Sequence, residues 1–160
     1  MQTCPSRKRA VLFFMLSLAA VAGAAQSRPN FSGTWTRIEP ELGPKDMYVE
    51  RIDLHDSALK IEVEFQTLGG IIGGGGKGEH TYTIGGPAET KTDSDGRHRS
   101  VVVTWDGPAL VFIRTTQEGA NTTTEREVWS LSEDGKKLTK SRETTSWQGT
   151  RQDRTVLERR

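Results

Sequence analysis

The three histidines are the side chains of this sequence best suited to bind a metal ion or to transfer a proton. His55, His80 and His98 are far apart in the chain, and the single cysteine, Cys4, lies near its beginning. Structural metal sites bring His and Cys ligands together at short spacings. Such spacing is absent, so we interpret the histidines as surface residues. His80, which follows Glu79, is the best single candidate for a ligand.

A glycine-rich run from Gly69 to Gly78 suggests a phosphate-binding loop. The P-loop pattern is Gly, four residues, then Gly-Lys-Ser/Thr. Counting back from Lys77, the first glycine position holds Ile71, and the residue after the lysine is Gly78. The run therefore favours a hairpin connection or a flap over a barrel mouth.

The sequence also lacks a motif for a catalytic nucleophile or for a pair of catalytic carboxylates. No serine lies in a Gly-x-Ser-x-Gly nucleophile elbow. Glu62 and Glu64 alternate with apolar residues, as on the solvated face of a strand. The sequence assigns no catalytic residue, no metal and no cofactor, and we expect a protein other than an enzyme.

The first 25 residues have the order of a secretory signal peptide. Arg7, Lys8 and Arg9 precede an apolar run from Ala10 to Ala22, and small residues follow it. The run is shorter than the roughly 20 residues of a spanning helix, so we favour cleavage over an uncleaved anchor. We expect residues 1–25 to be the signal and residues 26–160 a single exported domain, periplasmic or secreted.

The charge of the remaining chain argues against nucleic acid as a partner. Of the 22 Lys and Arg residues, three belong to the predicted signal peptide. The remaining chain therefore has 19 Lys and Arg residues and 21 Asp and Glu residues. A slightly negative protein lacks the basic surface that binds phosphate backbones. Cys4 also leaves, so the domain has no disulfide, and no later apolar stretch predicts stable membrane insertion.

Alternation of apolar and polar residues predicts β-strands through most of the domain. Leu59 to Phe65 is the clearest case, with apolar residues at every second position and charges between them. The other expected strands are 31–38, 47–54, 80–84, 99–105, 110–116, 122–131, 138–147 and, more weakly, 152–157. No segment after Pro29 has the pattern of a helix.

Three Asp-Gly pairs, Asp95-Gly96, Asp106-Gly107 and Asp134-Gly135, separate expected strands. Asp-Gly adopts the left-handed conformations that tight hairpins need, so neighbouring strands should pair antiparallel. We therefore predict an all-β fold, an antiparallel up-and-down barrel or half-barrel of about eight to ten strands. A barrel of this size either fills its interior or holds one small ligand. Inward aromatic residues would line such a pocket, and the candidates are Phe65, Tyr82, Trp105 and Phe112.

Three motifs in order resemble small exported bacterial proteins of the lipocalin-like (calycin) type. Residues 30–35 read Asn-Phe-Ser-Gly-Thr-Trp directly after the signal, residues 105–111 begin Trp-Asp-Gly, and residues 129–139 begin Trp-Ser-Leu-Ser. The resemblance covers nearly all of residues 29–158. The later lipocalin motifs and the usual C-terminal helix are missing.

The resemblance implies that Trp35 closes the narrow end of the barrel and that Gly33 lets the backbone pass close beneath it. It also implies that a basic residue of the last strand packs over Trp35, for which Arg151 and Arg154 are both candidates. The implied function is non-covalent binding of a small hydrophobic or amphipathic molecule. The alternatives are a solid-cored barrel that pairs with a protein partner through exposed strands and, less favoured, an enzyme on a calycin scaffold. The sequence leaves the oligomeric state open.

Overall fold

The computed structural model describes residues 28–39, 48–66 and 75–160, and all of its regular structure is β. The predicted signal, residues 1–25, lies outside the described residues, as does most of the glycine-rich run. No helix in the described part of the chain is long and apolar enough to cross a bilayer.

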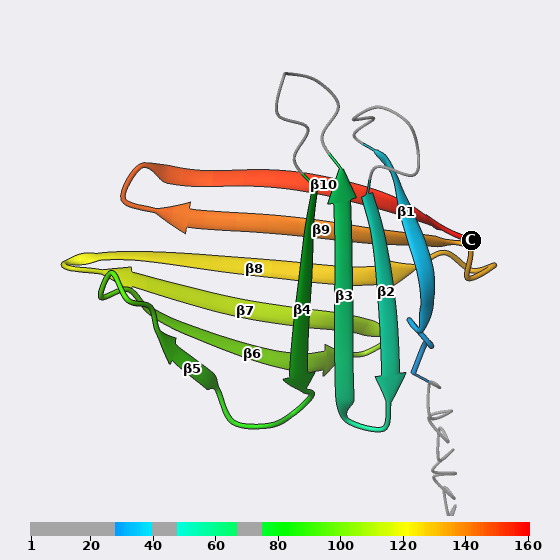
Figure 1. Ribbon diagram of the computed structural model, residues 1–160, viewed down its shortest axis with the longest axis horizontal. Coiled ribbons are helices and arrows are strands. Elements are labelled where there is room, and N and C mark those ends of the chain that lie inside the picture. The colour runs from blue at the N-terminus through cyan, green and yellow to red at the C-terminus, as the bar shows by residue number, and fades with distance from the viewer. Residues whose placement is uncertain (1–27, 40–47, 67–74) are drawn as a thin grey trace, which may run out of the picture.

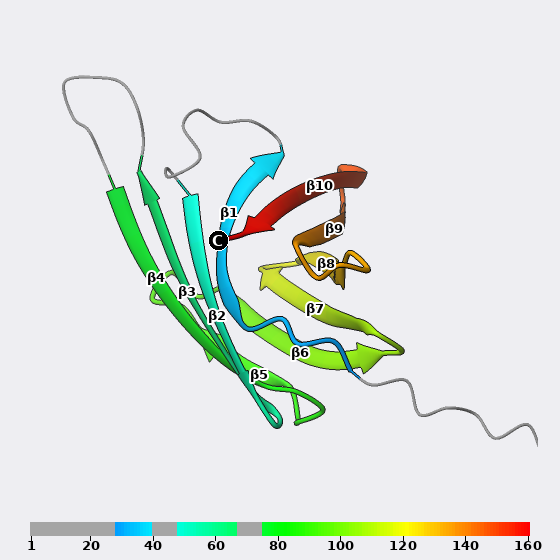
Figure 2. The same ribbon diagram turned by 90° about the vertical axis from the view of Figure 1, so that its right-hand side faces the viewer.

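Ten antiparallel strands form one sheet that curves into a nearly closed barrel (Figures 1 and 2). The strands are β1 (Gly33–Glu39), β2 (Tyr48–His55), β3 (Ala58–Gln66), β4 (Gly75–Thr83), β5 (Glu89–Thr92), β6 (His98–Asp106), β7 (Ala109–Glu118), β8 (Asn121–Leu131), β9 (Lys137–Ser146) and β10 (Gly149–Arg159). Their order is β4-β3-β2-β1-β10-β9-β8-β7-β6-β5, so the predicted meander and the all-β class are confirmed.

The barrel is closed by strand pairing between β1 and β10, but only partly closed between β4 and β5. β1 pairs antiparallel with β10, with a register shift between Arg37 and Glu39. On the other side β4 and β5 lie at the two ends of the sheet. Hydrogen bonds span this gap near the end of β4, where the Gly85 amide donates to the Val103 carbonyl at 2.8 Å and the Thr83 amide donates to Glu89 Oε1 at 3.0 Å.

The predicted turns are confirmed. The three Asp-Gly pairs lie at the β5–β6, β6–β7 and β8–β9 connections. Gly96, Gly107 and Gly135 have φ values of 83°, 57° and 67°, the left-handed conformation that glycine adopts without steric cost.

Two strands differ from the prediction. The sequence does not predict β5, because apolar and polar residues do not alternate in it. In the structure all four of its residues are exposed. β4 begins at Gly75, so the end of the glycine-rich run belongs to a strand rather than to a loop.

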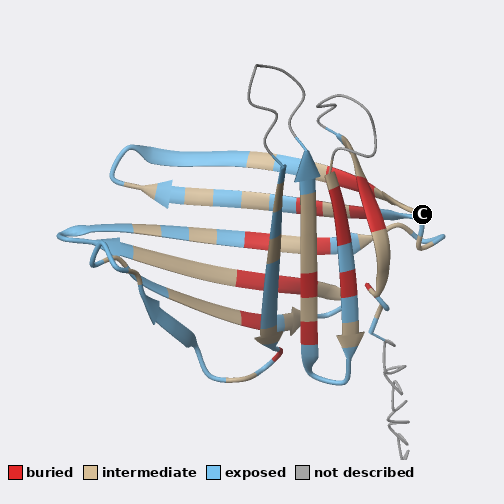
Figure 3. Ribbon diagram, viewed as in Figure 1, coloured by how far each residue is buried: buried red, intermediate tan, exposed pale blue. Residues whose placement is uncertain are grey.

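The hydrophobic core fills only one end of the barrel. Figure 3 shows that the buried residues gather in the same half of β6 to β9, in the half of β3 that begins at Ala58 and in the half of β2 that begins at Tyr48. The core cluster comprises Phe31, Trp35, Ile52, Leu59, Ile61, Ile84, Val103, Leu110, Phe112, Trp129, Leu138 and Leu157. Burial of this apolar surface is the main favourable contribution to folding.

Trp35 is fully buried at this end, and the cation over its ring comes from Arg159. The Arg159 guanidinium lies 4.3 Å from the Trp35 ring and donates to the carbonyls of Ser32 and Asn30. The expectation that Arg151 or Arg154 takes this position is wrong. The β1–β10 register aligns Trp35 with Arg159, whereas Arg151 and Arg154 lie farther along β10, opposite β9 residues.

Gly33 leaves room for this arginine. A Cβ at Gly33 would lie 2.8 Å from Arg159 Nη1, and the residue has φ of 142°, which side chains rarely adopt. The close approach that the sequence led us to expect at Gly33 therefore involves Arg159 as well as Trp35.

Candidate functional site

The half of the barrel that the core does not fill contains a cavity of about 760 Å³. This volume lies within the range of small-molecule sites, roughly 300–1,000 Å³. The cavity reaches the surface beside β5, where the exposed residues Glu89 and Lys91 contribute to its lining.

Strand alternation explains why this half is polar. On β8 the inward positions change from apolar at Leu131 and Trp129 to acidic at Glu127 and Glu125. β2 and β9 show the same change along their inward faces. Each strand thus keeps its period of two but exchanges apolar for charged side chains halfway along the barrel.

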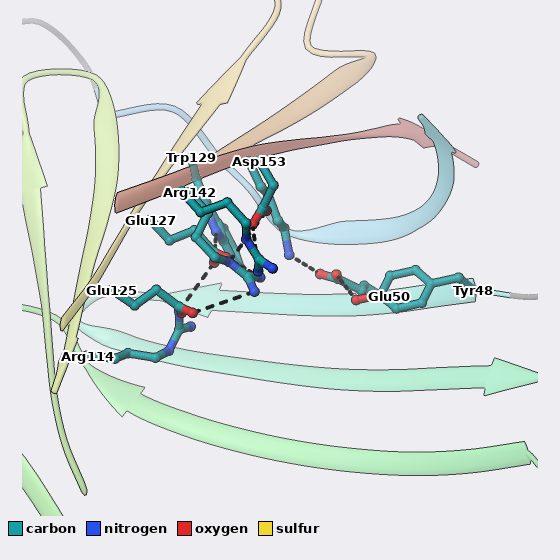
Figure 4. A network of polar contacts seen from close by, with 10 residues as sticks. Tyr48, Glu50, Arg114, Glu125, Glu127, Trp129, Arg142 and Asp153 are labelled. Carbon is teal, nitrogen blue, oxygen red and sulfur yellow. Dashed lines mark hydrogen bonds and ion pairs between the residues drawn. The ribbon is translucent and has the colours of Figure 1, made fainter. Parts of the chain in front are cut away.

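Glu127 is the centre of the first charged cluster, on β7, β8 and β9 (Figure 4). Its carboxylate is buried and accepts a hydrogen bond from Trp129 Nε1 at 2.7 Å. Arg142 donates to Glu127 Oε2 from Nε at 3.0 Å and from Nη2 at 2.8 Å. Arg114 donates to Glu125 Oε1 at 2.8 Å and lies 3.6 Å from Glu127 Oε1. These charge-assisted bonds fix both arginines against the wall.

Glu50 is the centre of the second cluster and connects β2 to β9 across the barrel. Tyr48 donates its hydroxyl to Glu50 Oε1 at 2.6 Å, and Lys140 donates its ammonium to Glu50 Oε2. Lys140 also lies 3.7 Å from the centre of the Trp129 ring. The bond between Lys140 and Glu50 joins residues that are 90 positions apart in the sequence.

The hydrogen bonds and ion pairs of the two clusters offset part of the free energy that burying their charges costs. Burial alone would raise the pKa of Glu127, but the cations Arg114, Lys140 and Arg142, together with the Trp129 hydrogen bond, lower it overall. Burial lowers the pKa of Lys140, while the carboxylates of Glu50 and Glu127 act in the opposite direction. Burial and the adjacent Glu50 carboxylate raise the pKa of Tyr48, which stays a neutral donor.

The facing side of the cavity, formed by β3 and β4, has fewer charged groups. Ile61 and Val63 of β3 and Tyr82 of β4 line it, together with Glu79, His80 and Thr81 of β4. Val101 of β6, a strand paired with β7, adds apolar surface beside the charged wall. Strands β3 and β4 cross over β7, β8 and β9 in Figure 1, so the wall with Ile61, Val63 and Tyr82 faces the charged wall. The cavity therefore offers hydrocarbon contact on one side and hydrogen-bonding groups on the other.

Of the four aromatic residues predicted to line a pocket, Tyr82 lies on the wall of this cavity. Phe112 is fully buried and packs edge-on against Tyr82, with ring centres 5.5 Å apart. Trp105 is partly buried and packs against the core, with its ring centre 5.9 Å from that of Phe31, outside the cavity lining. Phe65 is 44% exposed and borders a separate recess of about 200 Å³.

Reasoning from the sequence missed the charged residues of the cavity. Glu50, Glu127 and Lys140 occupy inward positions of predicted strands, and this periodicity was a usable signal. Charged residues on an amphipathic strand are ordinarily assigned to the solvent face, because such strands are commonly apolar only toward the core.

The histidines do not form a metal site. His80 lines the cavity and stacks on Tyr82, with ring centres 6.2 Å apart, while His55 and His98 are exposed. No group of three metal-binding side chains occurs within the ranges that the structure describes.

Comparison with known proteins gives a likeness of fold. No family model and no curated protein matches the sequence. Among solved structures, the chain is similar to a "REP1-NXSQ fatty acid transporter", with 14% sequence identity and a TM-score of 0.53. The match covers 81% of this chain and 95% of the transporter chain. At this identity the likeness is one of fold.

Proposed function

We propose that this protein is an exported, lipocalin-like barrel that binds a small amphipathic molecule non-covalently in the cavity beside Lys140. The observation that carries the proposal is a cavity of about 760 Å³ with apolar side chains of β3 and Tyr82 on one side and a cluster of charged side chains on the other. The neighbour named as a fatty acid transporter shares the fold, which supports an interior ligand. The signal-like segment at residues 1–25 supports export.

The two walls suggest how a ligand would lie. An alkyl or ring system would pack on Ile61, Val63 and Tyr82, where removal of apolar surface from water contributes roughly 25 cal/mol per Å². A polar head group would lie toward Lys140 and Arg142, whose charges are already paired with carboxylates. An entirely apolar ligand would strip water from these groups without replacing their hydrogen bonds, so an amphipathic ligand is favoured.

Binding rather than catalysis is the function that we propose. The charged groups form closed pairs, with Lys140 on Glu50 and Arg142 on Glu127. A general base needs an acceptor free to reach a substrate proton. Paired in this way, the carboxylates serve to hold the cavity wall in place.

The test combines a ligand panel with one variant that fills the cavity. Dodecanoate, dodecanol and dodecyltrimethylammonium would be titrated while tryptophan fluorescence is recorded, because Trp129 lies in the lining. Val101→Trp places a large side chain into the cavity. Val102→Trp is the matched control, since Val102 is the next residue of β6 and its side chain points to the other face.

We expect at least one of the three amphiphiles to bind and Val101→Trp to weaken that binding tenfold or more. Val102→Trp should leave the affinity unchanged. Absence of binding by the whole panel to the folded protein, or equal effects of the two substitutions, would refute the proposed site.

A further inference from the structure

The outer edge of β4 is a row of backbone groups without a strand partner within the described residues. The Ile84 amide donates to the Ser57 carbonyl at 2.7 Å, so even-numbered residues of this segment face β3. The Thr83 amide points the other way and donates to Glu89 Oε1. In an antiparallel sheet these directions alternate. The backbone groups of the odd-numbered residues from Gly75 to Thr81 therefore point to the open edge.

We propose that β4 pairs antiparallel with β4 of a second copy of this chain, with the two-fold axis at Gly78. In this register Lys77 lies opposite Glu79 of the second copy, and Gly75 lies opposite Thr81. Each of these residues directs its amide and carbonyl outward, so every pair can exchange hydrogen bonds. The two barrels then share one continuous sheet.

Charge selects this register over its neighbours. Moving the axis to Glu79 would place Glu79 opposite its own copy, and moving it to Lys77 would place two lysines opposite each other. Like charges directly opposite on adjacent strands are destabilising, whereas opposite charges are favourable. Registers shifted by a single residue would set outward-facing backbone groups against inward-facing ones. Only the axis at Gly78 both pairs the outward backbone groups and sets Lys77 against Glu79.

The side chains of β4 leave room for the second strand. Lys77 and Glu79 have side chains that are 79% and 60% exposed. Their ion pairs within the chain are to Glu64 at 3.4 Å and to Lys60 at 3.2 Å, on the neighbouring strand. Natural sheets commonly protect an exposed edge with a lysine that repels other strands. Here Glu79 follows Lys77 by two residues, so the charges of the edge are complementary to those of a second, antiparallel copy.

The first test reverses one charge and then exchanges both. Sedimentation velocity would be measured over a range of concentrations on protein expressed from the full sequence. We expect the wild type to dimerise and Lys77→Glu to weaken the dimer at least tenfold, because position 77 would then set a carboxylate against Glu79 of the second copy. The double variant Lys77→Glu/Glu79→Lys should dimerise as the wild type does.

The exchanged variant separates pairing between copies from pairing within the chain. In it the new carboxylate at position 77 lies beside Glu64, and the new ammonium at position 79 lies beside Lys60, so any loss of stability from these contacts remains. A restored dimer therefore reports on the contact between copies. A wild type that stays monomeric at hundreds of micromolar, or a double variant that fails to recover, would overturn the proposal.

A cysteine at the axis gives an independent readout. In a Cys4→Ser background, Gly78→Cys should form a disulfide between copies on mild oxidation, because position 78 faces itself in the proposed register. A Cβ at Gly78 has only His80 Nε2 nearby, at 3.8 Å, so the substitution fits the barrel. Thr90→Cys on β5 is the exposed control and should stay reduced. Equal crosslinking of both variants would contradict the register. Neither measurement requires a ligand, so the dimer and the proposed cavity function can fail separately.

Discussion

Replacing Lys140 with Met tests whether the charged wall is held by the contact between β2 and β9. The substitution keeps the length of the side chain but leaves the buried Glu50 carboxylate, which is 2% exposed, without its cation. Removal of one partner from a buried ion pair costs about 3–5 kcal/mol. For a domain of this size that loss lowers the melting temperature by about 10–20 °C.

The assay is urea unfolding at pH 7, followed by circular dichroism, with two comparison variants. Lys140→Met/Glu50→Leu removes both charges and should recover most of the lost free energy of unfolding, because a buried pair replaced by apolar groups is often neutral. Lys60→Met is the control. Lys60 pairs with Glu62 at 2.9 Å on the surface, so its replacement should leave the free energy of unfolding almost unchanged. A loss below about 1 kcal/mol at pH 7, or strictly additive effects in the double variant, would refute the reasoning.

Two further predictions concern other contacts of the barrel. The lowered pKa of Glu127 means that its stabilising contribution is present above its ordinary value of 4.5 and is lost on further acidification. Glu127→Gln should therefore flatten the acid limb of a plot of unfolding free energy against pH, and an unchanged acid limb would contradict this. Arg159→Met should cost roughly 2–3 kcal/mol in chemical denaturation, because it removes the cation over Trp35 and the bonds to three carbonyls. Arg151→Met, at an exposed position, should cost almost nothing, and equal losses would contradict the β1–β10 register.

The strands were predictable where local chemistry decides them. β3 alternates apolar and charged residues, and the Asp-Gly pairs at 95–96, 106–107 and 134–135 fix the hairpins beside them. β5 escaped prediction because its residues are all exposed, so no periodic pattern distinguishes it from a loop. The start of β4 escaped because glycines lack the side chains on which strand prediction depends.

The site was less predictable, because it depends on which strands face each other. Alternation places Glu50 and Lys140 on the inward faces of β2 and β9, but those residues are 90 positions apart. Only the β1–β10 closure brings the two strands together. For the same reason the aromatic candidates have different surroundings. Tyr82 lies on the cavity wall, whereas Trp105 packs against the core, although both point inward.

The sequence by itself determined the all-β class, the order of the hairpins and the inward or outward direction of most side chains, because these follow from the two-residue period and from turn chemistry. The tertiary structure decided that the apolar residues fill one end, that Arg159 covers Trp35, and that the other end keeps a charged cavity. These outcomes depend on the register with which the first strand meets the last. That register is a non-local pairing, set by the packing of the whole barrel rather than by any single segment.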